Sequence, residues 1–148
     1  MPNSAIVICS SCGTKNRIPV ARISEGPVCG RCKSPLNTAS VNTTPVIVTD
    51  QTFDREVMAH NTGVVMDCWA PWCGHCKSMD PVLTALALEY AGRIKVVKLN
   101  VDENPATTSR FRVMSLPSLL FFKAGKVVDS TVGALSRHEI DSHLKVLL

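Results

Sequence analysis

The amino-acid sequence predicts an α/β protein, with a mixed central sheet flanked by helices and a small cysteine-rich domain in front of it. After residue 45, strand-like apolar runs alternate with segments whose apolar residues recur at helical spacing. Six of the seven cysteines form three C-x-x-C pairs, two of them within the first 36 residues. A polar, nearly uncharged stretch separates the two parts. We therefore expect a cysteine-rich head at 1–36, a linker at 37–45 and a larger domain at 46–148.

The first half of the larger domain shows the patterns of two strands and two helices. The apolar run at 46–48 predicts a short strand, and a helix is expected to open at residue 50 and to end near residue 60. The β-branched run at 64–69 predicts a buried strand. Behind it, apolar residues recur at intervals of three and four: Met79, Val82, Leu83, Leu86 and Tyr90. That spacing predicts a helix with one buried face.

The second half continues the alternation and ends in a hairpin and a helix. The apolar run at 94–99 predicts another buried strand, and a short helix is expected at 105–112. The runs at 116–122 and 126–132 predict two strands joined by a tight turn, which makes them an antiparallel hairpin. Residues 136–139 read Ser-Arg-His-Glu, a capping box that starts the last helix. The residues expected to be buried in that helix are Ile140, Leu144 and Leu147.

The predicted order of elements places the third cysteine pair at a position suited to chemistry. The order β-α-β-α-β-α-β-β-α implies parallel strands joined by right-handed crossovers, with helices on both faces of the sheet. Cys73 and Cys76 follow the strand at 64–69 directly. They therefore lie at the carboxyl end of a central strand, where open α/β sheets hold their ligands.

The charge distribution excludes several classes of partner. The formal net charge is +4, and residues 1–40 carry five basic side chains against one acidic side chain. Five basic residues without interleaved aromatic residues argue against a nucleic-acid surface.

No apolar stretch is long enough to span a membrane and no secretion signal precedes the cysteines, so we expect no membrane partner and a cytoplasmic location. In a reducing compartment, C-x-x-C pairs bind metal or exchange electrons.

The segment 69–76, Trp-Ala-Pro-Trp-Cys-Gly-His-Cys, places two thiols where a strand gives way to a helix. Unpaired backbone N–H groups and the helix dipole favour a thiolate at Cys73, so its pKa is expected to fall and its exposed sulfur to react. Cys76, one turn further in, is expected to be more buried and to remain a thiol until a mixed disulfide forms. A structural disulfide or a metal site is the alternative for this pair. The seventh cysteine, Cys68, is expected to pack in the core.

These residues resemble the thioredoxin family. The motif at 64–77, the Leu-Pro-Ser-Leu run at 116–119 and the Val-Gly-Ala run at 132–134 carry the resemblance. It implies a thioredoxin fold over the larger domain, attack on a target disulfide by Cys73, and resolution of the mixed disulfide by Cys76.

The resemblance also implies roles for residues around the dithiol. Pro117 is expected to be a cis-proline that faces the dithiol. Trp72, Leu116 and Gly133 are expected to border the groove where a disulfide-containing protein substrate docks. By the same resemblance, an NADPH-dependent thioredoxin reductase recharges the enzyme, and we expect it to need no bound organic cofactor.

Asp67 is a carboxyl group within the otherwise apolar strand at 64–69. Burial is expected to raise its pKa, which makes it a candidate proton acceptor for Cys76. A structural aspartate that is hydrogen-bonded in the core is the alternative.

Gly74 and His75 separate the two cysteines and are expected to modulate the dithiol. Thioredoxins usually have proline where this chain has His75, whereas disulfide isomerases have histidine. A partly protonated imidazole beside Cys73 favours the thiolate, so the reduced form gains stability and the couple becomes more oxidising. We therefore predict a reduction potential between about −270 mV, as in thioredoxin, and about −180 mV, as in protein disulfide isomerase. A solvated histidine with little effect is the alternative.

The head has the cysteine spacing of a zinc ribbon, with sixteen residues between its two C-x-x-C pairs. The four candidate ligands are Cys9, Cys12, Cys29 and Cys32. Each pair is expected to form a tight knuckle, aided by Gly13 and Gly30, that presents two sulfurs to a structural Zn²⁺ ion. So short a segment has too few apolar residues to fold alone, and a metal would supply the missing stability. Iron or two disulfides are the alternatives. Such a head resembles that of the zinc-bearing thioredoxin-2 type found in bacteria.

Three functions are compatible with these patterns. The first is a thiol–disulfide oxidoreductase that reduces protein disulfides through Cys73 and Cys76. The second is a disulfide oxidase or isomerase that uses the same dithiol in the other direction. The third is an adaptor, in which the zinc ribbon binds a partner and the larger domain is only a scaffold; an intact dithiol argues against it.

Overall fold

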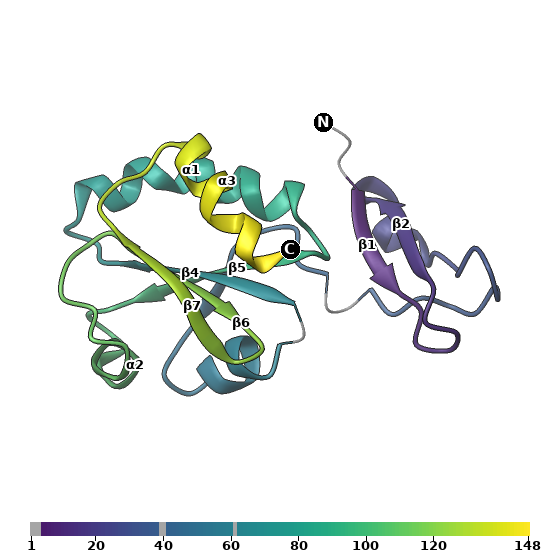
Figure 1. Cartoon of the computed structure of the whole chain (residues 1–148), viewed down its shortest axis with the longest axis horizontal. Coiled ribbons are helices and arrows are strands. Elements are labelled where there is room, and N and C mark those ends of the chain that lie inside the picture. The colour runs from purple at the N-terminus through teal and green to yellow at the C-terminus, as the bar shows by residue number, and fades with distance from the viewer. Residues whose placement is uncertain (1–3, 39–40, 61) are drawn as a thin grey trace.

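The computed structural model describes residues 4–38, 41–60 and 62–148. In these residues the chain forms a two-stranded sheet near its N-terminus and a separate five-stranded sheet flanked by helices (Figure 1). Residues 1–3 of the predicted head and 39–40 of the predicted linker lie outside the described residues. None of the described helices is both long and apolar enough to cross a membrane.

The five-stranded sheet is mixed, as predicted. Its strands, in chain order, are β3 Val46–Val48, β4 Gly63–Trp69, β5 Ile94–Asn100, β6 Ser118–Lys123 and β7 Lys126–Val132. They lie side by side in the order β3-β5-β4-β6-β7. Strands β3 and β4 pair with β5 in parallel, whereas β6 runs antiparallel to both β4 and β7. The central strand β4 is therefore hydrogen-bonded on both sides, which fixes the position of whatever follows it.

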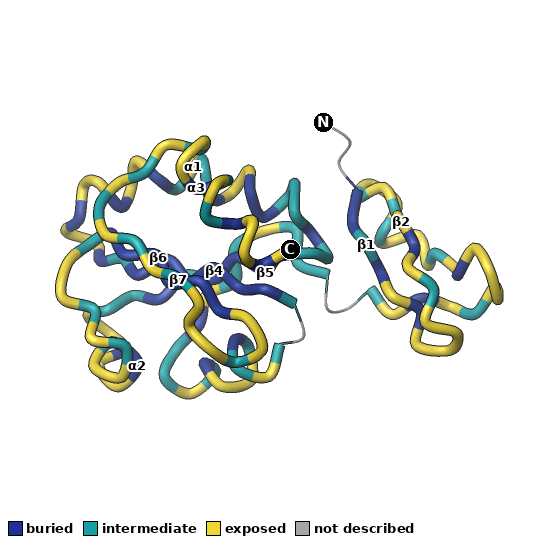
Figure 2. The backbone as a smooth tube through the Cα atoms, viewed as in Figure 1, coloured by how far each residue is buried: buried dark blue, intermediate teal, exposed yellow. Residues whose placement is uncertain are grey.

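Helices cover both faces of this sheet. Helices α1, Gly74–Glu89, and α3, Arg137–Leu144, lie on one face, and α2, Pro105–Arg110, lies on the other (Figure 1). Alternate residues of β4 enter two separate cores: Val65 packs with α1 and α3, whereas Val64 and Met66 pack on the opposite side. This alternation is the two-residue period of a strand buried on both faces. Figure 2 shows the buried residues concentrated along β4, β5 and β6.

Cys68 packs in the second of these cores and is fully buried, which confirms the core role predicted for it. Burial raises the pKa of its thiol to about 12, with a smaller contribution from the adjacent Asp67 carboxyl. A thiol of this kind carries no thiolate at neutral pH and does not compete with the dithiol.

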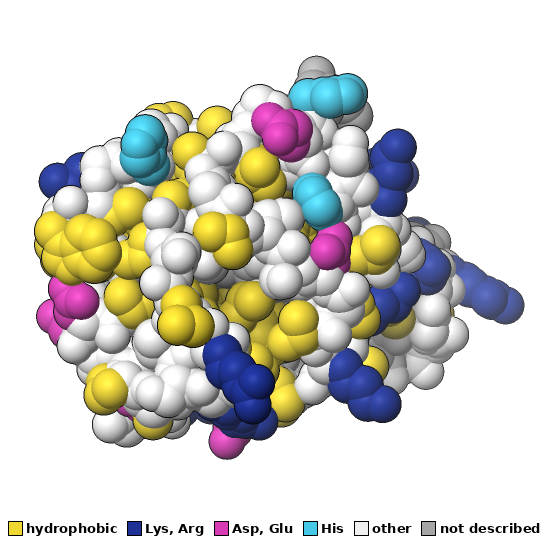
Figure 3. Space-filling model, turned by 60° about the vertical axis from the view of Figure 1, so that its left-hand side comes forward, with side chains coloured by type: hydrophobic (Ala, Val, Ile, Leu, Met, Phe, Trp, Pro, Cys, Tyr) yellow, Lys and Arg dark blue, Asp and Glu magenta, His cyan; other side chains and the backbone are white. Residues whose placement is uncertain are grey.

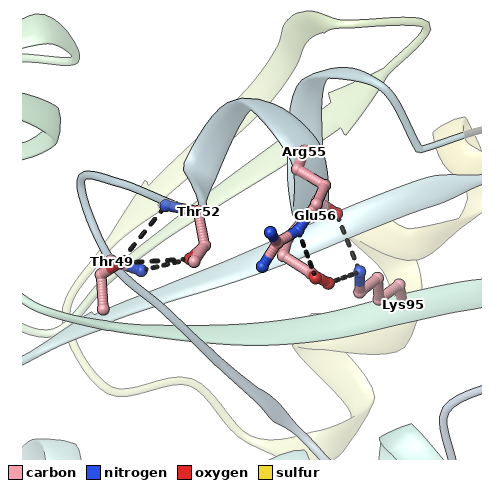
Figure 4. A network of polar contacts seen from close by, with 5 residues as sticks. All are labelled: Thr49, Thr52, Arg55, Glu56 and Lys95. Carbon is pink, nitrogen blue, oxygen red and sulfur yellow. Dashed lines mark hydrogen bonds and ion pairs between the residues drawn. The ribbon is translucent and has the colours of Figure 1, made fainter.

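The helix predicted at 50–60 is shorter and wider than expected. Thr49 and Thr52 form a hydrogen-bonded turn, and the helical segment that follows is a π-helical turn, η2, Asp54–Met58. The buried Lys95 ammonium donates to the Glu56 carboxylate at 2.6 Å and to the Glu56 carbonyl at 2.9 Å (Figure 4). The Ala59 N–H closes the wider turn on the Asp54 carbonyl. The prediction of a regular helix is therefore corrected to a π-helical turn that a distant strand contacts.

Asp50, expected to open that helix, caps a different one. Its carboxylate accepts hydrogen bonds from the Thr107 N–H at 2.8 Å, the Thr107 hydroxyl at 2.7 Å and the Ala106 N–H at 3.2 Å. The two N–H groups belong to the first turn of α2, where backbone donors have no partner within the helix. The Thr107 hydroxyl is the largest cause of the lowered pKa of Asp50. The Asp50 N–H donates in return to the Asn104 side chain, so the two segments are joined reciprocally.

Three other predictions need only small corrections or none. The strand predicted at 116–122 begins at Ser118, because Pro117 has no N–H to donate to a ladder. The helix predicted at 105–112 ends at Arg110, and Arg112 adopts a left-handed φ of 52°. The capping box at 136–139 is present as predicted, with reciprocal bonds between Ser136 and Glu139.

The head contains β1, Ser4–Ile8, paired antiparallel with β2, Lys15–Pro19, and a 3₁₀ turn, η1, Val20–Glu25. Its buried apolar residues are Val7, Cys9, Cys29 and Leu36, with Ile18 and Val41 packed at their edge. Val41 belongs to the predicted linker, which therefore contributes to the core of the head. So small a core does not stabilise a domain of this length without a further crosslink.

The head contacts the larger domain at the end remote from the dithiol. A Cβ added to Gly92 would lie 2.6 Å from the Ile6 carbonyl oxygen, so the β1 backbone approaches that glycine closely. Gly92 follows the C-terminal end of α1, whereas Cys73 and Cys76 lie at its N-terminal end. Helix α1 has 16 residues. At about 1.5 Å per residue, the two ends are roughly 24 Å apart.

Candidate active site and metal centre

Cys73 caps the N-terminus of α1. Its backbone is extended, with φ −90° and ψ 106°, and its Sγ accepts a hydrogen bond from the Cys76 N–H at 3.2 Å. The two sulfurs form a disulfide in this structure. A sulfur at an N-cap meets unpaired N–H donors and the positive end of the helix dipole, both of which stabilise negative charge. The geometry therefore favours the thiolate of Cys73 once the disulfide is reduced.

Cys73 is less accessible than predicted. Its exposed fraction is 6%, and that of Cys76 is 1%. The prediction of an exposed Cys73 is therefore wrong for the disulfide form, in which both cysteines are buried. Of the two, Cys73 is the less buried, as predicted.

Topology brings three other segments to the same end of the sheet. Strand β4 ends at Trp69, β6 starts at Ser118 and β7 ends at Val132. Because β6 is antiparallel to both neighbours, these three ends lie together. Three features therefore meet at this end of the sheet: the dithiol after β4, the Leu116–Pro117 pair before β6, and Gly133 after β7. The Leu116–Pro117 peptide bond is cis, and the Gly133 N–H donates to the Pro117 carbonyl at 2.8 Å.

Exposed apolar side chains surround this end. Trp72 is 71% exposed and Val132 68% exposed. Met114, three residues before Pro117, is 92% exposed and was not singled out from the sequence. Nothing in its local pattern distinguishes it from the neighbouring loop. Figure 3 shows hydrophobic side chains spread over this face of the molecule.

Trp72 is held in place by a residue outside the motif. Its Nε1–H donates to the Asp102 carboxylate at 3.0 Å. The loop after β5 thus orients an exposed aromatic ring beside the dithiol. An oriented, exposed ring of this kind offers contact area at low entropic cost.

Asp67 lies fully buried in β4, on the face that α1 covers. Neither of its carboxylate oxygens has a hydrogen-bond partner among the described residues. Desolvation raises its pKa to about 7; the Lys98 ammonium opposes this shift and the Asp80 carboxylate adds to it. A carboxyl group that titrates near neutral pH is able both to take up and to release a proton there. No described residue supplies the hydrogen bond that the alternative of a structural aspartate requires.

Gly74 and His75 form the start of α1, and both are exposed. The His75 carbonyl accepts a hydrogen bond from the Ser78 hydroxyl at 2.7 Å. The imidazole is therefore displayed to solvent within the same turn as the dithiol.

The four cysteines of the head meet at one point. Their Sγ atoms all lie within 4.8 Å of one another, and the pairs Cys9–Cys32 and Cys12–Cys29 are each 3.6 Å apart. A tetrahedral site with Zn–S bonds of about 2.3 Å has sulfurs about 3.8 Å apart, so the spacing fits such an ion. The Cys32 and Arg31 backbone N–H groups are among the causes that lower the pKa of Cys29 to about 6. This favours the thiolate that a metal requires.

The two knuckles are built alike, but not with the glycines expected. In one, the Gly13 N–H bonds the Cys9 carbonyl at 2.9 Å; in the other, the Lys33 N–H bonds the Cys29 carbonyl at 3.0 Å. Gly13 and Lys33 occupy the equivalent left-handed positions, with φ of 77° and 66°. The role predicted for Gly30 is therefore wrong, because its φ is not left-handed and a Cβ would fit there.

Asn16 links the two knuckles and was missed from the sequence. Its buried side chain donates to the Thr14 carbonyl at 3.1 Å and accepts from the Gly30 N–H at 2.9 Å. A single asparagine in a strand gives no local sign of this role, since its partners come from both cysteine loops.

Comparison with known proteins agrees with both sites. The family description "Thioredoxin" matches residues 44–146, and "Thioredoxin 2, N-terminal" matches residues 8–34. Thioredoxin 1 of Nostoc sp. is 45% identical over 98 residues, which cover 66% of this chain and 92% of that protein. The thioredoxin of Haemophilus influenzae is 46% identical over 93 residues, which cover 63% of this chain and 87% of that protein. The thioredoxin of Porphyra purpurea is 43% identical over 97 residues, which cover 66% of this chain and 91% of that protein.

The match to the thioredoxin family description covers residues 44–146, which hold the mixed sheet, the flanking helices and the disulfide-forming cysteine pair at the start of α1. The four-cysteine head agrees with the second family description. The chain belongs to the thioredoxin family and is a dithiol thiol–disulfide oxidoreductase that carries an N-terminal ribbon of the Thioredoxin 2 kind.

Proposed function

We propose that this protein works in the reducing direction and cleaves disulfides in other proteins. The match to thioredoxins supports the reducing direction, and the position of Cys73, whose sulfur caps α1 and accepts the Cys76 N–H, identifies the nucleophile. Stabilising the thiolate of Cys73 in this way prepares the nucleophile for attack on a disulfide.

The proposed reaction has two exchange steps. The Cys73 thiolate attacks one sulfur of the target disulfide, forms an S–S bond to it and releases the other target sulfur as a thiolate. The Cys76 thiol then loses its proton and attacks Cys73, which forms the Cys73–Cys76 disulfide and releases the first target sulfur. Two electrons pass to the target and two protons complete its thiols. In this scheme Asp67 accepts the proton of Cys76, because it is buried under α1 and titrates near pH 7.

The substrate docks, in our proposal, on the apolar end of the sheet. Trp72, Leu116, Pro117 and Gly133 would border the docking groove, and the exposed Met114 would extend it. A mixed disulfide needs the partner chain to lie beside Cys73, and this surface adjoins it. We further propose that an NADPH-dependent thioredoxin reductase restores the dithiol and that the protein acts in the cytoplasm. Because the dithiol itself carries both electrons, we propose that the protein binds no organic cofactor.

For the head we propose a structural Zn²⁺ ion held by the four cysteines, with the chain divided into a head at 1–36, a linker at 37–45 and a catalytic domain at 46–148. The head cysteines are free thiols at near-tetrahedral spacing, which favours a metal over two disulfides. When bound, the ion would join the two knuckles and supply the stability that the small core of the head lacks.

The reducing activity is tested by insulin reduction with NADPH and thioredoxin reductase. We expect Cys73→Ser to lose activity by a factor of at least about 1,000, because no nucleophile remains. Cys76→Ser should instead accumulate a mixed disulfide with the substrate, which mass spectrometry detects. Cys68→Ala, which removes a buried core thiol, is the matched control and should retain activity. Full turnover by Cys73→Ser would refute the scheme.

Metal analysis of the same sample tests the head. We expect about one zinc ion per chain. Iron, or no metal together with two head disulfides, would contradict the proposed site.

The pH dependence of stability tests the state of Asp67 in the disulfide form, where Cys73 and Cys76 do not titrate. The pKa of Asp67 is about 7 in the folded chain, against an ordinary value of 3.8. Between these values the folded state holds a proton that the unfolded state has lost, so the free energy of unfolding falls as pH rises. The free energy of unfolding of Asp67→Asn lacks this dependence. Measured by urea unfolding, it should therefore rise relative to that of the wild type by roughly 4 kcal/mol between pH about 4 and about 8. A difference that does not vary with pH would show that Asp67 is already ionised.

The role of His75 is tested by the equilibrium with glutathione. We expect the wild-type reduction potential to lie between about −270 and −180 mV, and that of His75→Pro to be lower, because the imidazole no longer stabilises the Cys73 thiolate. His138→Ala changes a histidine of α3 and should leave the potential unchanged. A wild-type value no higher than that of His75→Pro would eliminate this role. A value at or above about −180 mV would instead favour the oxidase or isomerase direction.

A further inference from the structure

A lysine lies between two carboxyl groups beneath α1. Asp67 of β4 and Lys98 of β5 are direct neighbours in the parallel register, so their side chains emerge on the same face of the sheet. Asp80 lies on α1, which covers that face. Only one of the two carboxyl groups binds the lysine.

The Lys98 ammonium pairs with Asp80. Its Nζ lies 2.6 Å from the Asp80 Oδ1, and it also lies over the Trp69 ring, 5.1 Å from the ring centroid. The Lys98 side chain is 20% exposed and that of Asp80 46% exposed, so the pair sits at the rim of the core. A short charge-assisted hydrogen bond together with a cation–π contact holds the ammonium away from the interior.

Asp67 is left without a counter-ion in contact. It is fully buried, and neither oxygen has a hydrogen-bond partner among the described residues. An unpaired buried carboxylate is costly, and a neighbouring lysine is the usual remedy. Here the lysine next to it in the sheet is bound elsewhere.

We propose that Asp80 is a positioning residue of the dithiol chemistry: by binding Lys98 it keeps that ammonium from pairing with Asp67, and so leaves the buried carboxyl group able to take the proton of Cys76. Asp80 touches neither the dithiol nor the substrate in this role and acts through Lys98. The inference rests on the proposed function of Asp67 as the proton acceptor.

The groups that act on Asp67 are few and come from the elements packed against it. Strand β5 contributes Lys98, which favours ionisation, and α1 contributes Asp80, which opposes it; the adjacent Cys68 of β4 packs in the core on the opposite face. Cys68 stays neutral because burial raises its pKa to about 12. In the disulfide form Cys76 does not titrate, so only Lys98 and Asp80 remain to influence the ionisation of Asp67.

The test is a ¹³C NMR titration of the Asp67 carboxyl carbon in the full-length disulfide form, identified by its loss in Asp67→Asn. In Asp80→Asn, Lys98 is released to approach Asp67, and we expect the titration midpoint to fall by about one pH unit. Asp54→Asn is the matched control. It also removes a carboxylate from an ion pair, the Asp54–Arg110 pair, but on a different element. Its midpoint for Asp67 should equal that of the wild type.

Repeating the test in a Lys98→Met variant distinguishes action through Lys98 from direct repulsion between the Asp80 and Asp67 carboxylates. Lys98→Met should raise the midpoint, and adding Asp80→Asn to Lys98→Met should produce little further change. A fall of equal size with and without Lys98 would overturn the proposal, as would an unchanged midpoint in Asp80→Asn. Since the titration is carried out on the disulfide form without substrate, its outcome is independent of whether the protein reduces insulin.

Discussion

The hydrogen bond from the Cys76 N–H to the Cys73 sulfur is the interaction on which the chemistry of this protein depends. It makes the sulfur the cap of α1, so the donors and dipole of a 16-residue helix act on one atom. The position of that cap is fixed by β4, which is hydrogen-bonded to β5 on one side and β6 on the other. The reversed direction of β6 and β7 then brings Pro117 and Gly133 to the same end, where Trp72 is oriented by Asp102.

A second constraint is the buried carboxyl of Asp67 below the same helix. It is buried with no hydrogen-bond partner in the described part of the chain, which is unfavourable for the stability of the folded state at neutral pH, and this cost is consistent with a functional group. The head is arranged differently, since its small core relies on four converging sulfurs and contacts the larger domain near Gly92. Because Gly92 is at the far end of α1, the head leaves the dithiol end uncovered. The two sites are thus separate in space and in the physical source of their stability.

Features that depend on local chemistry were predictable from the sequence. Apolar runs located the five strands of the larger domain, helical spacing located the long helix, and the capping box at Ser136 located α3. The C-x-x-C spacings located both cysteine sites. The contacts that could not be predicted all join segments distant in the chain: Asp50 caps α2, Lys95 reshapes the turn at Glu56, and Asn16 links two cysteine loops. Lys33 in a left-handed conformation was also missed, because the expected glycine lies elsewhere in the knuckle. The pairing of Lys98 with Asp80 instead of Asp67 likewise requires the packing of α1 on the sheet.

The central claim is that the sulfur of Cys73 ionises readily because it caps a helix. The most direct measurement is the rate of alkylation of Cys73 by iodoacetamide in the reduced chain as a function of pH, with the modified residue identified by mass spectrometry. We predict that the rate reaches half its maximum at a pH well below about 8.5, the pKa of an ordinary cysteine. A half-maximal rate near that value, with alkylation no faster at neutral pH than that of an unstructured cysteine peptide, would contradict it.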